Sequence, residues 1–142
     1  LFSDWVGEEG AGHVVKMVYN GIQYGGMQLI CGAYHLMKHV LGMEQNKMAQ
    51  DFKDWNKTEL DSFLIEITAN ILKFQGADGK HLLPKIRDST GQKGTRKWTT
   101  ISTLEDGIPV TFIGKAIFAR CLSSLKDERI QASKKLKGSQ KI

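Results

Sequence analysis

Apolar residues recur over residues 10–40 with the spacing of one face of a helix. The positions are Val14, Val15, Val18, Ile22, Leu29, Ala33 and Leu36. This period is typical of a long amphipathic helix and predicts that these side chains form its buried stripe. Gly42 follows as a plausible stop, because glycine readily adopts the left-handed conformation that ends helices.

Polar side chains occupy the other side of the same predicted helix. Lys16, Asn20, Gln23 and Tyr24 are spaced so that all four project from one face. An amine, amides and a phenol arranged in this way suit the wall of a polar-ligand site. Most polar helix faces are simply solvated, however, and spacing alone favours that interpretation.

The rest of the chain alternates between short helical patterns and turn signals. No strand alternation and no internal repeat appears, so the predicted fold class is all-α. Asn56 or Thr58 is the expected cap of the third helix. The expected helices cover 45–53, about 58–74, 98–105 and 110–135, and the expected turns and loops cover 75–79, 82–88 around Pro84, 89–97, and 107–109.

Composition is that of one ordinary globular domain. The chain has 142 residues, of which 41% are hydrophobic and 25% are charged. No apolar run approaches the roughly 20 residues of a membrane span, so we expect no membrane partner. Cys31 and Cys121 lie in apolar helical contexts, which predicts buried thiols and a reducing, cytoplasmic compartment.

Two further signals are weak. The basic segment 133–141 contributes to the net charge of +5, but it has no interleaved aromatic residues. A solvated helix end is therefore favoured over a nucleic-acid partner. His35 and His39 have the spacing of a metal-binding pair without a third ligand between them, so we expect a surface pair and no metal site.

One segment carries a more specific pattern. Residues 16–24 read Lys-Met-Val-Tyr-Asn-Gly-Ile-Gln-Tyr, and this resembles the Lys-x-x-His-Asn-Gly-x-Glu-Tyr signature of the 6-phosphogluconate dehydrogenase family. The likeness covers nearly the whole chain. It continues through residues 54–56, 60–68, 91–95 and 119–124.

The resemblance implies a place within a larger architecture. Members of the family have a Rossmann coenzyme domain followed by a large helical domain, and this chain is similar to the first part of the helical one. Residues 1–9 would be a linker remnant and residues 10–142 a partial all-helical domain. The glycines at 7, 10 and 12 lack the dinucleotide-binding spacing and follow no predicted strand. NADP is the family's cofactor, and none is expected on this chain alone.

The resemblance also implies an activity and a role for each matching residue. The family oxidises and decarboxylates 6-phosphogluconate to ribulose 5-phosphate, a reaction of the pentose phosphate pathway. Lys16 matches the general base, and Asn20, Tyr24, Lys93 and Arg120 match the substrate-binding residues. A lysine can act as a base only if desolvation or a neighbouring cation lowers its pKa.

Three positions depart from the family pattern. Gln23 replaces the glutamate that donates a proton, and Tyr19 replaces a histidine that contacts substrate. Arg96 stands where the family usually has glycine, so it either adds charge near the phosphate or strains a loop. Whether the chain is an enzyme therefore stays open, and we expect it to be inactive alone.

Two classes of function follow. The first is part of the decarboxylating dehydrogenase, binding 6-phosphogluconate or a similar sugar phosphate. The alternative is a pseudoenzyme or interaction module that retains sugar-phosphate binding or pairs with a full-length relative. In either case we expect association with another chain, either as a homo-oligomer or with such a relative.

Overall fold

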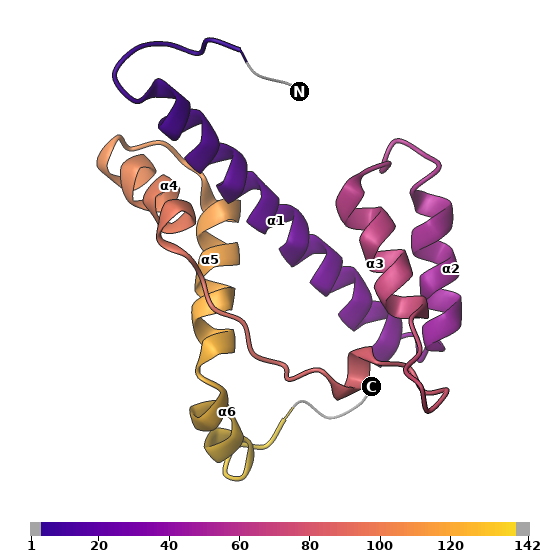
Figure 1. Ribbon diagram of the computed structural model, residues 1–142. Coiled ribbons are helices and arrows are strands. Elements are labelled where there is room, and N and C mark those ends of the chain that lie inside the picture. Colours follow the sequence, from indigo (N-terminus) through magenta and orange to yellow (C-terminus); the bar gives the residue numbers. More distant parts are fainter. Residues whose placement is uncertain (1–3, 139–142) are drawn as a thin grey trace. The chain divides into compact units, whose positions relative to one another are not determined.

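The computed structural model describes residues 4–138, except for the side chain of Arg96. Among these residues the only β pairing is an isolated bridge between Gln75 and His81, so the predicted all-α class is confirmed. Figure 1 shows the helices, which are α1 (Ala11–His39), α2 (Gln45–Trp55), α3 (Phe63–Lys73), the 3-10 helix η1 (Leu83–Lys85), α4 (Gly94–Glu105), α5 (Thr111–Ser124) and α6 (Lys126–Ser133).

The chain forms two compact units. One comprises Leu1–Gly25 with Asp88–Ile142, and the other comprises Gly26–Arg87. The long helix α1 contributes its first half to one unit and its second half to the other. No helix in the described part of the chain has the length and apolarity needed to cross a membrane.

The unit of residues 26–87 has its core where α2 and α3 lie side by side (Figure 1). The buried side chains are Met37, Met48, Ala49, Phe52, Ala69 and Leu72. The apolar residues of α2 and α3 recur at intervals of three or four, so they face one another and Met37 of α1. Gln45 Nε2 donates to the Leu72 carbonyl at 2.9 Å and so satisfies an unpaired group at the end of α3.

The cap of α3 differs from the prediction. Ser62 is the N-cap, and its hydroxyl accepts from the Ile65 amide at 3.2 Å. Asn56 accepts from the Ser62 amide at 2.9 Å, and the Thr58 hydroxyl donates to the Trp55 carbonyl at 2.7 Å. Both expected caps therefore stabilise the turn that precedes the helix.

In the other unit, glycines of α1 form its packing face. Thr99 of α4 is buried, and its hydroxyl donates to the Met17 carbonyl at 2.8 Å. A Cβ atom on Gly21 would lie 3.1 Å from Ile113 of α5, and one on Gly25 would lie 2.3 Å from Phe112. The absence of side chains at these two positions lets α4 and α5 approach the α1 backbone.

The predicted buried stripe of α1 is wrong. Its large members are exposed, and only Ala33 is partly buried. Tyr24, placed on the polar face by the sequence, is instead 3% exposed. The reason is that α1 packs through glycines and Tyr24 in one unit and through Met37 in the other. The exposed stripe residues are Val14, Val15, Val18, Ile22, Leu29 and Leu36.

Several further details correct the sequence predictions. Helix α4 begins at Gly94, within the segment expected to be a loop. The last predicted helix is divided at Leu125, where ψ is 53° and the helical path is interrupted. Cys31 and Cys121 are free and exposed, not buried, because they lie on faces of α1 and α5 that no described residue covers.

Candidate functional site

The candidate residues on α1 differ in their exposure. Lys16 and Tyr19 are exposed, Asn20 and Gln23 are partly buried, and Tyr24 is buried. The Lys16 ammonium lies 4.3 Å from the centre of the Tyr19 ring. This is a cation–π contact between residues one turn apart. The Tyr19 ring thus contacts the candidate base directly.

Arg120 of α5 contacts two segments that carry candidate residues, namely α1 at Tyr24 and the loop of residues 88–93 that precedes α4. Its guanidinium carbon lies 4.1 Å from the centre of the Tyr24 ring. Its Nε donates to the Gly91 carbonyl at 2.8 Å, and its Nη2 donates to the Thr90 hydroxyl at 2.7 Å. The planar guanidinium allows both hydrogen bonds and the ring contact at once. Arg120 therefore brings α1, α5 and the loop before α4 together.

Lys93 ends this loop and is the N-cap residue of α4. Its side chain is exposed. The first amides of α4 lack carbonyl partners within the helix, and a helix N-terminus attracts anions. An exposed ammonium at this point gives the end of the loop positive character. Arg96 lies in the first turn of α4, and its side chain is outside the described residues.

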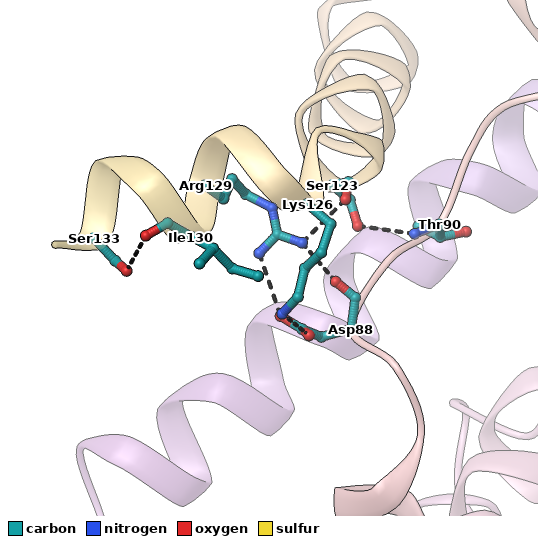
Figure 2. Close-up of polar contacts among 7 residues, drawn as sticks. All are labelled: Asp88, Thr90, Ser123, Lys126, Arg129, Ile130 and Ser133. Atoms are coloured by element: carbon teal, nitrogen blue, oxygen red, sulfur yellow. Dashed lines mark hydrogen bonds and ion pairs between the residues drawn. The ribbon is translucent and has the colours of Figure 1, made fainter.

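A second set of contacts fixes the start of the loop, and Figure 2 shows it. The Asp88 carboxylate accepts from the Lys126 ammonium, and from Arg129 Nη1 at 3.2 Å. Arg129 Nη2 also donates to the carbonyls of Asp88 at 2.5 Å and of Ser123 at 3.0 Å. The Ser123 hydroxyl in turn accepts from the Thr90 amide at 3.1 Å.

The charges around Asp88 change its titration. The hydrogen bond from Lys126, followed by that from Arg129, lowers the pKa of the Asp88 carboxyl to about 2. The carboxylate therefore stays ionised across the neutral range. The break at Leu125 contributes to this arrangement, because it leaves the Ser123 carbonyl available to Arg129.

Comparison with known proteins decides the family. Residues 12–142 match the family described as 6-phosphogluconate dehydrogenase, C-terminal domain. The chain belongs to the 6-phosphogluconate dehydrogenase family. The decarboxylating 6-phosphogluconate dehydrogenase of Homo sapiens is 83% identical over 139 residues, which cover 98% of this chain and 29% of that protein. The Caenorhabditis elegans enzyme is 62% identical over 133 residues, covering 94% of this chain and 28% of the enzyme.

A solved structure agrees. The 6-phosphogluconate dehydrogenase of Plasmodium falciparum, studied in its apo form, with its cofactor NADP+ and with its substrate 6-phosphogluconate, has a TM-score of 0.91 and 41% sequence identity. The match covers 96% of this chain and 29% of that one. This chain thus spans less than a third of the length of its relatives, and it corresponds to their helical part.

The glycines before α1 do not form a dinucleotide-binding fingerprint. Gly7 and Gly10 adopt positive φ angles in the turn before α1. No strand precedes them within residues 4–138, so the strand–turn–helix of a dinucleotide fingerprint does not form there. We therefore assign no residue of this chain to the cofactor.

The histidine pair is a surface feature, as predicted. The rings of His35 and His39 lie 4.7 Å apart on an exposed part of α1. Within the described part of the chain, no group of three or more His, Cys, Asp or Glu residues could hold a metal ion.

Sequence reasoning missed the residues around Asp88. Asp88 lies 38 positions before Lys126 and 41 before Arg129, so no local pattern joins them. The one available signal was the spacing of Lys126 and Arg129, which puts two cations on one face of a helix. That signal does not identify the carboxylate they bind.

Proposed function

We propose that this chain forms the sugar-acid-binding helical part of an NADP-dependent, decarboxylating 6-phosphogluconate dehydrogenase. One observation carries the proposal, namely the contacts of Arg120 with Tyr24 and with the loop that leads to Lys93. Three residues matching the family's substrate-binding set thus come from α1, α5 and the start of α4. An ammonium and a guanidinium are both suited to a phosphate group.

Each residue has a role in this proposal. Lys16 removes the proton from the C3 hydroxyl of the sugar acid. NADP, held by another part of the enzyme, would supply the hydride acceptor. Asn20 and Tyr24 orient the sugar acid, and Lys93 and Arg120 hold its phosphate. Loss of carbon dioxide leaves an enediol that must be protonated on carbon. Gln23 has no titratable proton, and loss of a positioned acid typically costs about 10²- to 10⁴-fold in rate.

The chain alone is expected to be inactive, because no residue in it is assigned to the hydride acceptor. Neither the wild-type chain nor its Gln23→Glu variant should reduce NADP when given 6-phosphogluconate. The measurement is the absorbance of reduced nicotinamide, with the human enzyme as positive control. Turnover by the wild-type chain that disappears in Lys16→Ala would contradict this expectation.

A second candidate function is an interaction module without catalysis. The substitutions at Tyr19 and Gln23 favour it, and so do the exposed apolar side chains of α1. Such a module would pair with a second copy or with a full-length relative through this helix. A cytoplasmic location fits both functions and stays a prediction.

Thermal unfolding with and without millimolar 6-phosphogluconate separates the two functions. A ligand that binds only the native state raises the melting temperature by mass action. A rise that is lost in Lys93→Ala would support the sugar-phosphate site. A cooperative transition unaffected by the ligand would overturn that site and favour the interaction module.

A further inference from the structure

The loop of residues 88–93 is held at three of its first four positions. The Asp88 carboxylate is bound by Lys126 and Arg129, and the Asp88 carbonyl by Arg129. The Thr90 amide donates to Ser123, and the Gly91 carbonyl accepts from Arg120. The contacts among five of these residues are named the Asp88 clamp (Figure 2). The five are Asp88, Thr90, Ser123, Lys126 and Arg129.

Lys93 depends on its backbone for its position. Among the described residues its side chain forms no ion pair and no side-chain hydrogen bond, and it does not cap α4 with a side-chain bond. Two residues of chain reach at most about 7 Å. The last held point, Gly91, therefore limits where the Lys93 backbone can lie relative to Arg120.

The clamp is more than an exposed ion pair. Isolated surface ion pairs contribute little, because solvent screens them. The Asp88 side chain is 67% exposed, whereas those of Lys126 and Arg129 are 22% and 30% exposed. Arg129 also binds two backbone carbonyls, which fixes the path of the main chain. Such contacts order the loop locally.

We propose that Asp88, through Lys126 and Arg129, is a positioning residue that holds Lys93 beside Arg120 for a phosphate group. This inference rests on the proposed function, because it takes the phosphate of a sugar acid as the ligand. A loop that is already ordered does not have to be ordered when the ligand binds, and preorganisation of this kind increases affinity. Without the clamp, the loop has to be ordered when the ligand binds, and the loss of conformational entropy weakens the affinity.

The test measures the dissociation constants of 6-phosphogluconate and of gluconate, which lacks the phosphate, by calorimetry on the purified protein. Asp88→Asn should weaken 6-phosphogluconate binding about 5- to 20-fold and leave gluconate binding nearly unchanged. In a Lys93→Ala background, Asp88→Asn should weaken 6-phosphogluconate binding little further, because the side chain that Asp88 positions has already been removed. Asp88→Glu, which keeps the carboxylate, should recover part of the loss.

Asp78→Asn is the matched control. It removes an exposed carboxylate that pairs with Lys85 at 2.5 Å in the other unit, and both affinities should stay as in wild type. Equal losses for the two ligands in Asp88→Asn, or a full additional loss in the Lys93→Ala background, would show a general structural role and overturn the proposal.

Hydrogen exchange without ligand separates this inference from the proposed function. Asp88→Asn should speed exchange of amides in residues 89–93, and Asp78→Asn should not. Unchanged exchange would overturn the positioning role whatever the ligand data show. If the wild-type protein binds neither ligand, the proposed function fails and the phosphate assignment fails with it. Faster exchange in that case would still establish that Asp88 orders the loop.

Discussion

Lys93 is a candidate binding residue whose removal should leave folding intact, because its side chain is exposed. Lys93→Ala should weaken 6-phosphogluconate binding at least about tenfold, since a hydrogen bond to a charged group contributes about 1.5–3 kcal/mol. Lys97→Ala is the control, because Lys97 is also an exposed lysine of α4. Calorimetric titration measures both. Equal affinities for the two variants would exclude a specific role for Lys93.

The lowered pKa of Asp88 predicts how the stability of the protein depends on pH. Its pKa is lowered from 3.8 to about 2 in the folded protein. A lowered carboxyl pKa adds stability that is present above the unfolded value and is lost as the pH falls through the folded value. The difference in unfolding free energy between wild type and Asp88→Asn should thus be constant above about pH 5 and shrink between about pH 4 and 2.

Urea unfolding at a series of pH values measures this difference. The comparison isolates Asp88, because the other carboxyl groups are common to both proteins. In a background carrying Lys126→Ala and Arg129→Ala, the difference should lose its pH dependence. A difference that persists unchanged down to pH 2 would contradict the assignment of these two partners.

At the scale of elements, the glycines of α1 determine how it packs. Gly25→Ala would place a Cβ atom 2.3 Å from the Phe112 ring, so the ring or the helix must move. Overpacking of this kind costs about 1–3 kcal/mol. Gly32→Ala, also in α1, has no neighbouring atom within 4 Å. It should stabilise the helix by about 0.5–1 kcal/mol, because glycine is a poor helix former.

Denaturant unfolding of the two variants provides the check. The change in unfolding free energy should have opposite signs in the two variants, although both replace glycine by alanine in the same helix. If both variants were stabilised to the same extent, Phe112, which is 41% exposed, would have moved aside at no cost. The close approach of α5 to Gly25 would then not contribute to packing.

For the whole molecule, the exposed apolar side of α1 predicts association. Ile22 and Leu29 are 60% and 64% exposed, and large apolar patches usually mark interaction surfaces. The isolated chain should therefore self-associate at micromolar concentration, as sedimentation velocity would measure. Ile22→Glu combined with Leu29→Glu should yield monomers. Leu136→Glu, at an exposed apolar residue beyond α6, should not, and a monomeric wild-type chain would contradict the prediction.

The sequence by itself determined the all-α class, most of the helices and the family. Local periodicity, glycines and prolines predict the long helix over residues 10–40 and the short ones that follow it, because these signals act within a few residues. The Lys16–Tyr24 signature identified the family for the same reason, since a motif on one helix is contiguous in the sequence.

Only the tertiary structure decided which side chains are buried and which meet. Periodicity separates the two faces of α1 but does not say which one packs, and here glycines and Tyr24 pack while the valines are exposed. The contact of Arg120 with Tyr24 and the Asp88 clamp join residues from distant parts of the chain. Such contacts depend on helix packing and on the break at Leu125, and no short-range pattern encodes either of them.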